Sequence, residues 1–259
     1  MVGHTGYARY VALGDSQTEG LWDGDDAAGL RGFADRLAER LDALFPGLQY
    51  ANVAVRGNQI RDVADVQLPA ALAMDADLIT LCIGMNDMTR PGRGFDRALA
   101  QLQDVHRSLA ASGATVVTTT FPDLARILPI GRVLGARVLA INELIRAAAA
   151  RHGFALVDLY AAPSMIQPDT WSPDRVHGSP RGHQRFAEAA AEALGLPGSS
   201  HAWAVADPTA APPSLRSRTY SQVLWTQNML MPWLWNHLQG RPVGGTRGPR
   251  RPALAQLVG

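Results

Sequence analysis

A serine, a histidine and an aspartate stand where together they could carry nucleophilic chemistry. Ser16 follows the apolar run at residues 10–13, in the stretch "VALGDSQTEG". A serine hydroxyl becomes a nucleophile when a histidine takes its proton and a carboxylate orients that histidine. Among the seven histidines, His177 is the best candidate, because Asp174 precedes it by three residues in a loop. In a turn, this spacing lets Asp174 accept a hydrogen bond from Nδ1 while Nε2 faces outward.

Each of these signals also has a simpler interpretation. Ser16 could lie in an ordinary turn after a strand, and Asp174 and His177 could form a solvated loop pair. Two further stretches, "NVAVRGN" at residues 52–58 and "GMND" at residues 84–87, fall after other apolar runs. The backbone N–H of Gly57 and the side-chain amide of Asn86 could stabilise an oxyanion during acyl transfer. Taken alone, each could equally be a turn residue.

The elements that must position these residues follow from the apolar pattern. Five short apolar runs, at residues 10–13, 50–53, 78–83, 115–120 and 155–159, have the composition of buried strands. Amphipathic helical patterns separate them, with apolar residues at steps of three and four. Strands that alternate with helices predict an α/β fold, a three-layer α/β/α sandwich with a five-stranded parallel sheet. Such sheets bind ligands beyond the carboxyl ends of their strands, where Ser16 lies.

The order of these blocks resembles the SGNH hydrolase superfamily, the GDSL esterases and lipases. Its Gly-Asp-Ser block is matched at residues 14–16, its second block at 52–57, its Gly-x-Asn-Asp block at 84–87, and its Asp-x-x-His block at 174–177 with Gly-His at 182–183. The resemblance implies a flavodoxin-like fold, Ser16 as nucleophile, His177 as base and Asp174 as its orienting acid. It also implies an oxyanion hole formed by the N–H groups of Ser16 and Gly57 and the amide of Asn86.

Other residues of these blocks have expected supporting roles. Asp15 is expected to brace the nucleophile turn, and Asp87 the Asn86 loop. Gln17 stands where the family motif has leucine, and together with Arg56 and Asn58 it is a candidate for substrate binding. Arg56 could favour an anionic or polyhydroxylated substrate, although a surface salt bridge is the simpler expectation.

The composition excludes several other classes of chemistry. All 24 basic residues are arginine, so the chain cannot form a Schiff base or a Walker lysine site. The single cysteine, Cys82, lies in an apolar run and is expected to be a buried, inert thiol. His183 could suggest a metal site with His177 and Asp174, but the spacing fits no compact zinc pattern. We expect no metal and no cofactor.

The character of the chain changes after the predicted catalytic domain at residues 1–198. Residues 199–259 are expected to form an extension with a linker, a Trp-rich helical segment and a tail rich in Arg, Gly and Pro. The tryptophans could form a flap, a dimer surface or a peripheral membrane contact, or could pack on the core. The tail arginines are expected to be solvated. They are Arg247, Arg250 and Arg251.

Size and charge bound the function further. A chain of 259 residues, 47% apolar and with a formal net charge of +1, has a sizeable core and gives no global reason to bind nucleic acid. No signal peptide is apparent, and no apolar run approaches the roughly 20 residues that span a membrane, so a cytoplasmic location is expected. We predict a small-acyl esterase or carbohydrate deacetylase acting on a small-molecule ester. A lysophospholipase or thioesterase, or a non-catalytic binding module, is the alternative, and the oligomeric state is left open.

Overall fold

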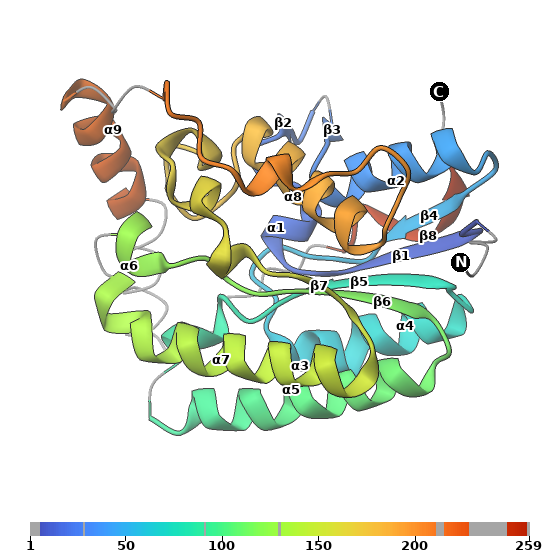
Figure 1. Cartoon of the computed structure of the whole chain (residues 1–259). Coiled ribbons are helices and arrows are strands. Elements are labelled where there is room, and N and C mark those ends of the chain that lie inside the picture. Colours follow the sequence, from blue (N-terminus) through green and yellow to red (C-terminus); the bar gives the residue numbers. More distant parts are fainter. Residues whose placement is uncertain are drawn as a thin grey trace.

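A parallel sheet forms the middle layer of the protein, and Figure 1 shows it between two layers of helices. The computed structural model describes residues 6–27, 29–90, 92–128, 131–210, 215–227 and 248–257. The sheet has the strand order β7-β6-β5-β1-β4-β8. Its five parallel strands are β1 (Arg9–Gly14), β4 (Gln49–Asn52), β5 (Leu78–Cys82), β6 (Thr115–Thr119) and β7 (Ala155–Val157).

The predicted α/β sandwich with five parallel strands is therefore confirmed, and a sixth strand was missed. This strand is β8 (Arg251–Gln256), which pairs antiparallel with β4 at the sheet edge. Its sequence, RPALAQ, contains a proline and follows a Gly- and Arg-rich stretch, so its local pattern does not indicate a strand. Proline is tolerated at a sheet edge because no further strand needs its missing N–H.

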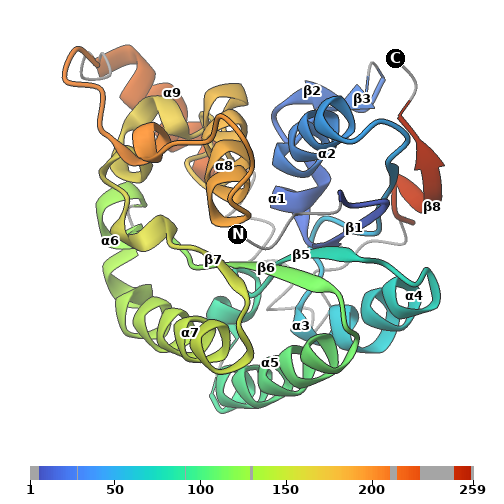
Figure 2. The same ribbon diagram turned by 45° about the vertical axis from the view of Figure 1, so that its right-hand side comes forward.

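The helices cover both faces of the sheet, as the amphipathic patterns predict (Figure 2). One face packs against α2 (Phe33–Leu44) and α8 (Pro180–Ala193). The other packs against α4 (Leu68–Ala73), α5 (Gly94–Ala111) and α7 (Gly131–His152). Apolar residues from each helix are buried against the strands, so the core consists of two apolar layers, one on either side of the sheet.

Shorter elements connect these layers and carry most of the candidate residues. The helical ones are α1 (Ser16–Glu19), α3 (Ile60–Asp62), α6 (Leu124–Ile127), α9 (Leu215–Trp225), a π-helical turn (Val63–Gln67) and 3-10 turns at Asp87–Thr89, Leu159–Ala161, Pro163–Ile166, Pro168–Thr170 and His201–Ala204. A small antiparallel ribbon pairs β2 (Gly24–Asp25) with β3 (Gly29–Leu30).

The strand order decides where a ligand can bind. When the five parallel strands are renumbered 1 to 5 along the chain, their order across the sheet is 2-1-3-4-5, which is the flavodoxin-like arrangement. β1 and β5 are neighbours, and the connections that leave them run in opposite directions along the sheet. This switch point opens a crevice at the carboxyl ends of the two strands. Ser16 follows β1 and Asn86 follows β5, so both lie at this crevice.

The predicted extension is only partly described. Trp233, Trp235 and Arg247 lie outside the described residues, and so does the side chain of Trp225. The expectation of solvated tail arginines is wrong for Arg250 and Arg251, because both contact the folded domain. The domain boundary at residue 198 stays a prediction. Within the described part of the chain, no helix is both long and apolar enough to cross a membrane, and the cellular location stays a prediction.

Candidate active site

The turn that carries Ser16 depends on a glycine. β1 ends at Gly14, whose φ of +156° disfavours other residues. A Cβ at this position would lie 2.2 Å from Oγ1 of Thr18 and 2.5 Å from the carbonyl oxygen of Cys82. Asp15 then caps α1, its Oδ1 accepting a hydrogen bond from the N–H of Gln17 at 3.1 Å. The chain therefore changes from strand to helix within two residues and presents Ser16 at the first turn of α1.

Ser16, His177 and Asp174 form one chain of hydrogen bonds. Oγ of Ser16 lies 2.8 Å from Nε2 of His177, and Nδ1 of His177 lies 2.7 Å from Oδ2 of Asp174. The carboxylate accepts from Nδ1–H, which leaves Nε2 to accept the serine proton. Ser16 is half-buried, whereas Asp174 and His177 are buried. The structure thus brings together the three residues that the sequence singled out, although Ser16 and His177 lie 161 positions apart in the chain.

The loop around Asp174 keeps its carboxylate ionised. Oδ1 of Asp174 accepts from Oγ of Ser172 at 2.6 Å, from the N–H of Val176 at 2.9 Å and from the N–H of His177 at 3.1 Å. Burial raises the pKa of Asp174, but the hydrogen bond from His177 and these further donors outweigh it and hold the pKa well below its ordinary value. The loop is closed by a bond from the N–H of Ser172 to the carbonyl of His177.

Asn86 lies beside the nucleophile turn, as expected. Its Nδ2 donates to the carbonyl of Asn58 at 2.8 Å and to Oδ2 of Asp15 at 3.3 Å. The bond to Asp15 is the longer and therefore the weaker one, and it links the amide to the Ser16 turn. Burial raises the pKa of Asp15 to about 7, because the pocket offers this carboxyl little solvation.

Asp87 braces the loop that follows β5. Its Oδ2 accepts from the N–H of Ile60 at 3.0 Å, and its Oδ1 lies 3.5 Å from the guanidinium of Arg90. Burial raises the pKa of Asp87 to about 6 despite these partners. This carboxyl joins the start of α3 to the Asn86 loop and faces the interior, so the structural role assigned to it agrees with its contacts.

The second block forms a tight turn at the crevice. The N–H of Asn58 donates to the carbonyl of Val55 at 3.1 Å, and Gly57 has a φ of +83°. The guanidinium of Arg56 binds Glu19 at 2.7 Å and Asp26 at 2.8 Å. The expected salt bridge of Arg56 is therefore present, and the same side chain also lines a cleft beside His177.

Gln17 contacts the loop that carries His177, and both ring nitrogens of His183 bind backbone groups of other segments. Oε1 of Gln17 accepts from the N–H of Gly178 at 3.2 Å, and its buried Nε2 has no hydrogen-bond partner within the described chain. Nδ1 of His183 accepts from the N–H of Phe33 at 3.2 Å, and Nε2–H donates to the carbonyl of Leu21 at 3.0 Å. Burial lowers the pKa of His183 to about 4, so this imidazole is a neutral link between α8, α2 and the Ser16 region.

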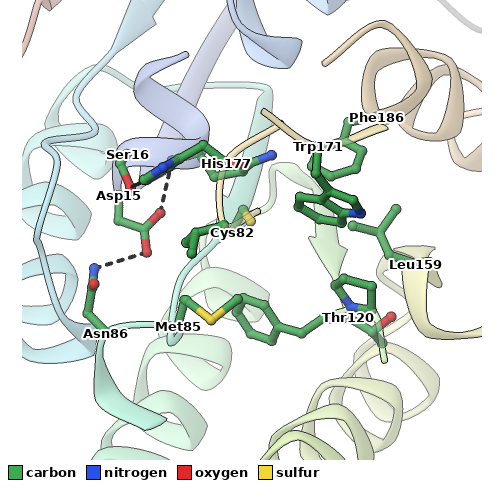
Figure 3. A pocket seen from close by; sticks show the side chains of 14 residues that line it. Asp15, Ser16, Cys82, Met85, Asn86, Thr120, Leu159, Trp171, His177 and Phe186 are labelled. Atoms are coloured by element: carbon green, nitrogen blue, oxygen red, sulfur yellow. Dashed lines mark hydrogen bonds between the residues drawn. The ribbon is translucent and has the colours of Figure 1, made fainter. Parts of the chain in front are cut away.

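Two hollows flank His177. The first, a cavity of about 50 Å³, lies beside Ser16, and Figure 3 shows the side chains that line it. Its wall is mainly apolar and comes from Cys82, Met85, Phe121, Leu159, Trp171 and Phe186. The second is a cleft of about 340 Å³ whose lining includes polar groups. It is lined by Leu21, Trp22, Gly24, Asp25, Asp26, Leu30, Arg56, Asp174 and His177.

Sequence reasoning missed several residues that hold the turn carrying Ser16. β4 diverges from β1 beyond Asn52, which leaves the backbone of Gly14 without a partner strand on that side. The side-chain amide of Gln67 takes its place, since Oε1 accepts from the N–H of Gly14 and Nε2 donates to its carbonyl, each at 2.8 Å. Nδ2 of Asn52 donates to the carbonyl of Thr18 at 2.8 Å. The only local signal for Gln67 was a polar residue in an apolar stretch.

Known proteins share this fold and these blocks. The model of the GDSL-like lipase/acylhydrolase family matches residues 12–185. LAE5, an alpha/beta hydrolase enzyme from the metagenome of Lake Arreo, Spain, is 25% identical, with a TM-score of 0.58 over 73% of this chain and 95% of that one. No curated protein matches the sequence significantly.

Two acetyl xylan esterases are similar in fold. Axe2 from Geobacillus stearothermophilus is 20% identical, with a TM-score of 0.59 over 73% of this chain and 94% of its own. AlAXEase is 20% identical, with a TM-score of 0.58 over 72% and 99%. The family model covers more than half of the sequence and includes Ser16, Gly57, Asn86, Asp174 and His177. The chain therefore belongs to the GDSL-like lipase/acylhydrolase family and is a carboxylic ester hydrolase of the SGNH type.

Proposed function

We propose that Ser16 attacks the carbonyl carbon of a carboxylic ester and forms an acyl-enzyme. The observation that carries this proposal is the hydrogen-bonded chain from Ser16 through His177 to Asp174, with distances of 2.8 and 2.7 Å. His177 takes the hydroxyl proton as the serine oxygen bonds to the carbonyl carbon. The tetrahedral intermediate collapses, the ester C–O bond breaks, and His177 gives the proton to the leaving alcohol. Water then attacks the acyl-enzyme by the same route and releases the acid.

The oxyanion is stabilised in this proposal by three N–H donors. They are the backbone N–H groups of Ser16 and Gly57 and the side-chain amide of Asn86. The amide is held next to the Ser16 turn by Asn58 and Asp15. Both of its N–H groups have acceptors here, so in the proposed reaction the one on Asp15, at 3.3 Å, turns to the oxyanion. Donors fixed before the reaction stabilise developing charge without reorganising, and the loss of one typically costs ~100- to 1,000-fold in rate.

The acyl group is small in the proposed reaction. The cavity beside Ser16 has about 50 Å³ and is bounded by the rings of Phe121, Trp171 and Phe186. Trp171 is fixed, because its indole N–H donates to the carbonyl of Met165 at 2.7 Å. An acetyl methyl group is the kind of group such a wall accommodates, whereas a long acyl chain would need the buried rings to move. This argues against a lysophospholipase or a long-chain thioesterase.

The alcohol part is proposed to be polyhydroxylated and to occupy the cleft of about 340 Å³. An exposed tryptophan with several carboxylates and a guanidinium offers both stacking and hydrogen-bonding partners to a sugar. Similar structures support this proposal, since two of them are acetyl xylan esterases. Axe2 also has catalytic mutants at a serine, an aspartate and a histidine, the last two three positions apart. A carbohydrate deacetylase is therefore the proposed activity, with no cofactor.

The first experiment is hydrolysis of p-nitrophenyl esters from acetate to palmitate by the wild type and by Ser16→Ala. We expect activity that peaks at acetate and disappears in the variant. A peak at long chains would reject the small-acyl proposal and favour the lipid alternatives. A folded wild type that neither hydrolyses any ester nor reacts with a fluorophosphonate would favour a binding module instead.

A further inference from the structure

Arg250, near the carboxyl end of the chain, contacts the turn that carries Ser16. We propose that Arg250 is a positioning residue, which fixes the two backbone donors of the oxyanion hole through Glu19. The inference rests on the function proposed above for Ser16 and Gly57. Arg250 lies outside the matched region at residues 12–185, so this contribution comes from the extension.

The segment that carries Arg250 is anchored at the edge of the sheet, by strand pairing and by the side chain of Arg251. β8 pairs with β4 through Tyr50 and Ala255, and Asn52 is the partner of Arg251. The guanidinium of Arg251 lies over the ring of Tyr50 at 5.7 Å and 3.7 Å from Asp35. The backbone next to Arg250 is therefore held in place before its side chain makes any contact.

The Arg250 guanidinium donates to two backbone carbonyls. Its Nη1 lies 2.7 Å from the carbonyl oxygen of Glu19, and its Nη2 lies 2.6 Å from that of Leu30. Asp35 lies 3.9 Å from the same Nη1 and supplies the counter-charge. A planar guanidinium can hold two acceptors in a fixed geometry, which a lysine cannot do.

Glu19 is the last residue of α1, the four-residue helix that begins at Ser16. A helix leaves its last carbonyls without internal partners, and in a single turn these groups are a large share of the backbone. Here the carbonyl of Thr18 is bound by Asn52, and that of Glu19 by Arg250. The orientation of the helix that presents Ser16 is thus determined from outside it.

The carboxylate of Glu19 contacts the segment that carries the second proposed backbone donor, the N–H of Gly57. It accepts from the backbone N–H of Arg56 at 2.8 Å and from the Arg56 guanidinium at 2.7 Å. The residue after Arg56 is Gly57. Arg250 therefore binds the backbone of Glu19, and the side chain of Glu19 in turn binds Arg56, next to Gly57. Loss of Arg250 would loosen the spacing between the N–H groups of Ser16 and Gly57.

The expected consequence lies in the transition state. The oxyanion forms only in the tetrahedral intermediates and the transition states that flank them, so poorer alignment of its donors lowers kcat and leaves KM for a small ester nearly unchanged. A displacement of ~1 Å can cost ~100-fold in rate, and we expect a loss of about tenfold or more for Arg250→Ala.

The test compares Arg250→Ala and Arg250→Lys with the matched control Arg251→Ala in the full-length protein. Arg251 belongs to the same segment and contacts Asp35 but makes no contact with α1 among those described. Steady-state kinetics on p-nitrophenyl acetate would be measured where circular dichroism shows all variants folded. We expect kcat to fall in Arg250→Ala, a partial loss in Arg250→Lys, near-normal kcat in Arg251→Ala, and recovery of Arg250→Ala with millimolar guanidinium chloride.

A second measurement, hydrogen–deuterium exchange, does not depend on activity. We expect faster exchange in peptides covering residues 15–21 and 53–58 of Arg250→Ala than in those of Arg251→Ala. Equal exchange and equal kcat in these two variants would overturn the inference and leave β8 as a stabilising strand only. A wild type without esterase activity or fluorophosphonate labelling would reject the proposed function instead, and the exchange data would still decide whether Arg250 holds the turn.

Discussion

The two hollows beside His177 differ in size and in chemistry. The cavity next to Ser16 is about 50 Å³ and is bounded by buried apolar side chains, whereas the cleft beyond His177 is about 340 Å³ and is lined by Trp22, Asp25, Asp26 and Arg56 among others. Because the cavity wall is part of the core, it can discriminate substrates by size. The cleft is formed by a surface ribbon and a turn, so it can discriminate by hydrogen bonds and stacking.

The two hollows also differ in the pKa of a buried carboxyl group that lines each of them. Asp15 lines the apolar cavity, where burial raises its pKa to about 7. Asp174 lines the cleft and is also buried, but the hydrogen bonds from His177 and Ser172 outweigh burial and hold its pKa well below the ordinary value. Burial alone therefore does not decide the charge of a carboxyl group. The number of hydrogen-bond donors that face the carboxyl group also decides whether it is charged.

The largest expected effect follows from replacing Ser16, which is the proposed nucleophile and also lines the small cavity. Ser16→Ala removes the nucleophile, and kcat on p-nitrophenyl acetate should fall by ~10⁵- to 10⁶-fold, as in other serine hydrolases. Circular dichroism and thermal unfolding should match the wild type, since the substitution removes one oxygen at a half-buried position. Undiminished turnover in a folded variant would reject Ser16 as the nucleophile.

Asp15→Asn tests the raised pKa in the cavity. A carboxyl with a pKa of 3.8 when unfolded and about 7 when folded binds its proton more tightly in the folded state. Its stabilisation is complete below the unfolded pKa and is lost as the pH rises through about 7, with a limit of about 4 kcal/mol. Urea unfolding between pH 4 and 8 should therefore show the wild type losing stability relative to Asp15→Asn as the pH rises. Parallel pH profiles would contradict this environment for Asp15.

Leu159→Ala tests the size limit of the cavity. Removal of three carbons from a wall residue that is 3% exposed should raise the butyrate-to-acetate ratio of kcat/KM about tenfold, since one methylene is worth roughly 10- to 200-fold in a fitted pocket. It should also cost about 2–5 kcal/mol of unfolding free energy. Leu21→Ala in the cleft is the control, and an equal change in its acyl-chain profile would show that the two hollows do not divide the substrate as proposed.

Trp22→Ala should have the smallest and most selective effect. Trp22 is 37% exposed and has a φ of +71°, so its truncation removes cleft surface at little cost in folding. We expect KM for an acetylated xylo-oligosaccharide to rise about three- to tenfold, as for the loss of a single stacking contact, with no change for p-nitrophenyl acetate. Equal effects on both esters would place the sugar elsewhere.

The ordered blocks of the sequence were sufficient to single out the candidate catalytic residues. Ser16, Asn86 and His177 were predictable because each follows a recognisable strand or precedes a helix, and parallel strands bring their carboxyl ends to one edge. The five parallel strands were predictable because each falls in a short run rich in apolar and β-branched residues, although β4 and β6 also carry polar side chains. The hydrogen-bonded chain itself confirms the geometry expected of these side chains.

The surroundings of those residues depended on tertiary structure. Gln67 binds Gly14 from 53 positions away, and Arg250 binds Glu19 from 231 positions away. Nothing in their local sequence indicates these partners, because a side-chain amide or guanidinium satisfies any backbone group that the fold places before it. The sequence by itself determined which side chains are candidates for nucleophile and base. Only the packing of separate elements decided the size of the cavity beside Ser16, the environment of Asp15 and Asp174, and the contact of Arg250 with the Ser16 turn.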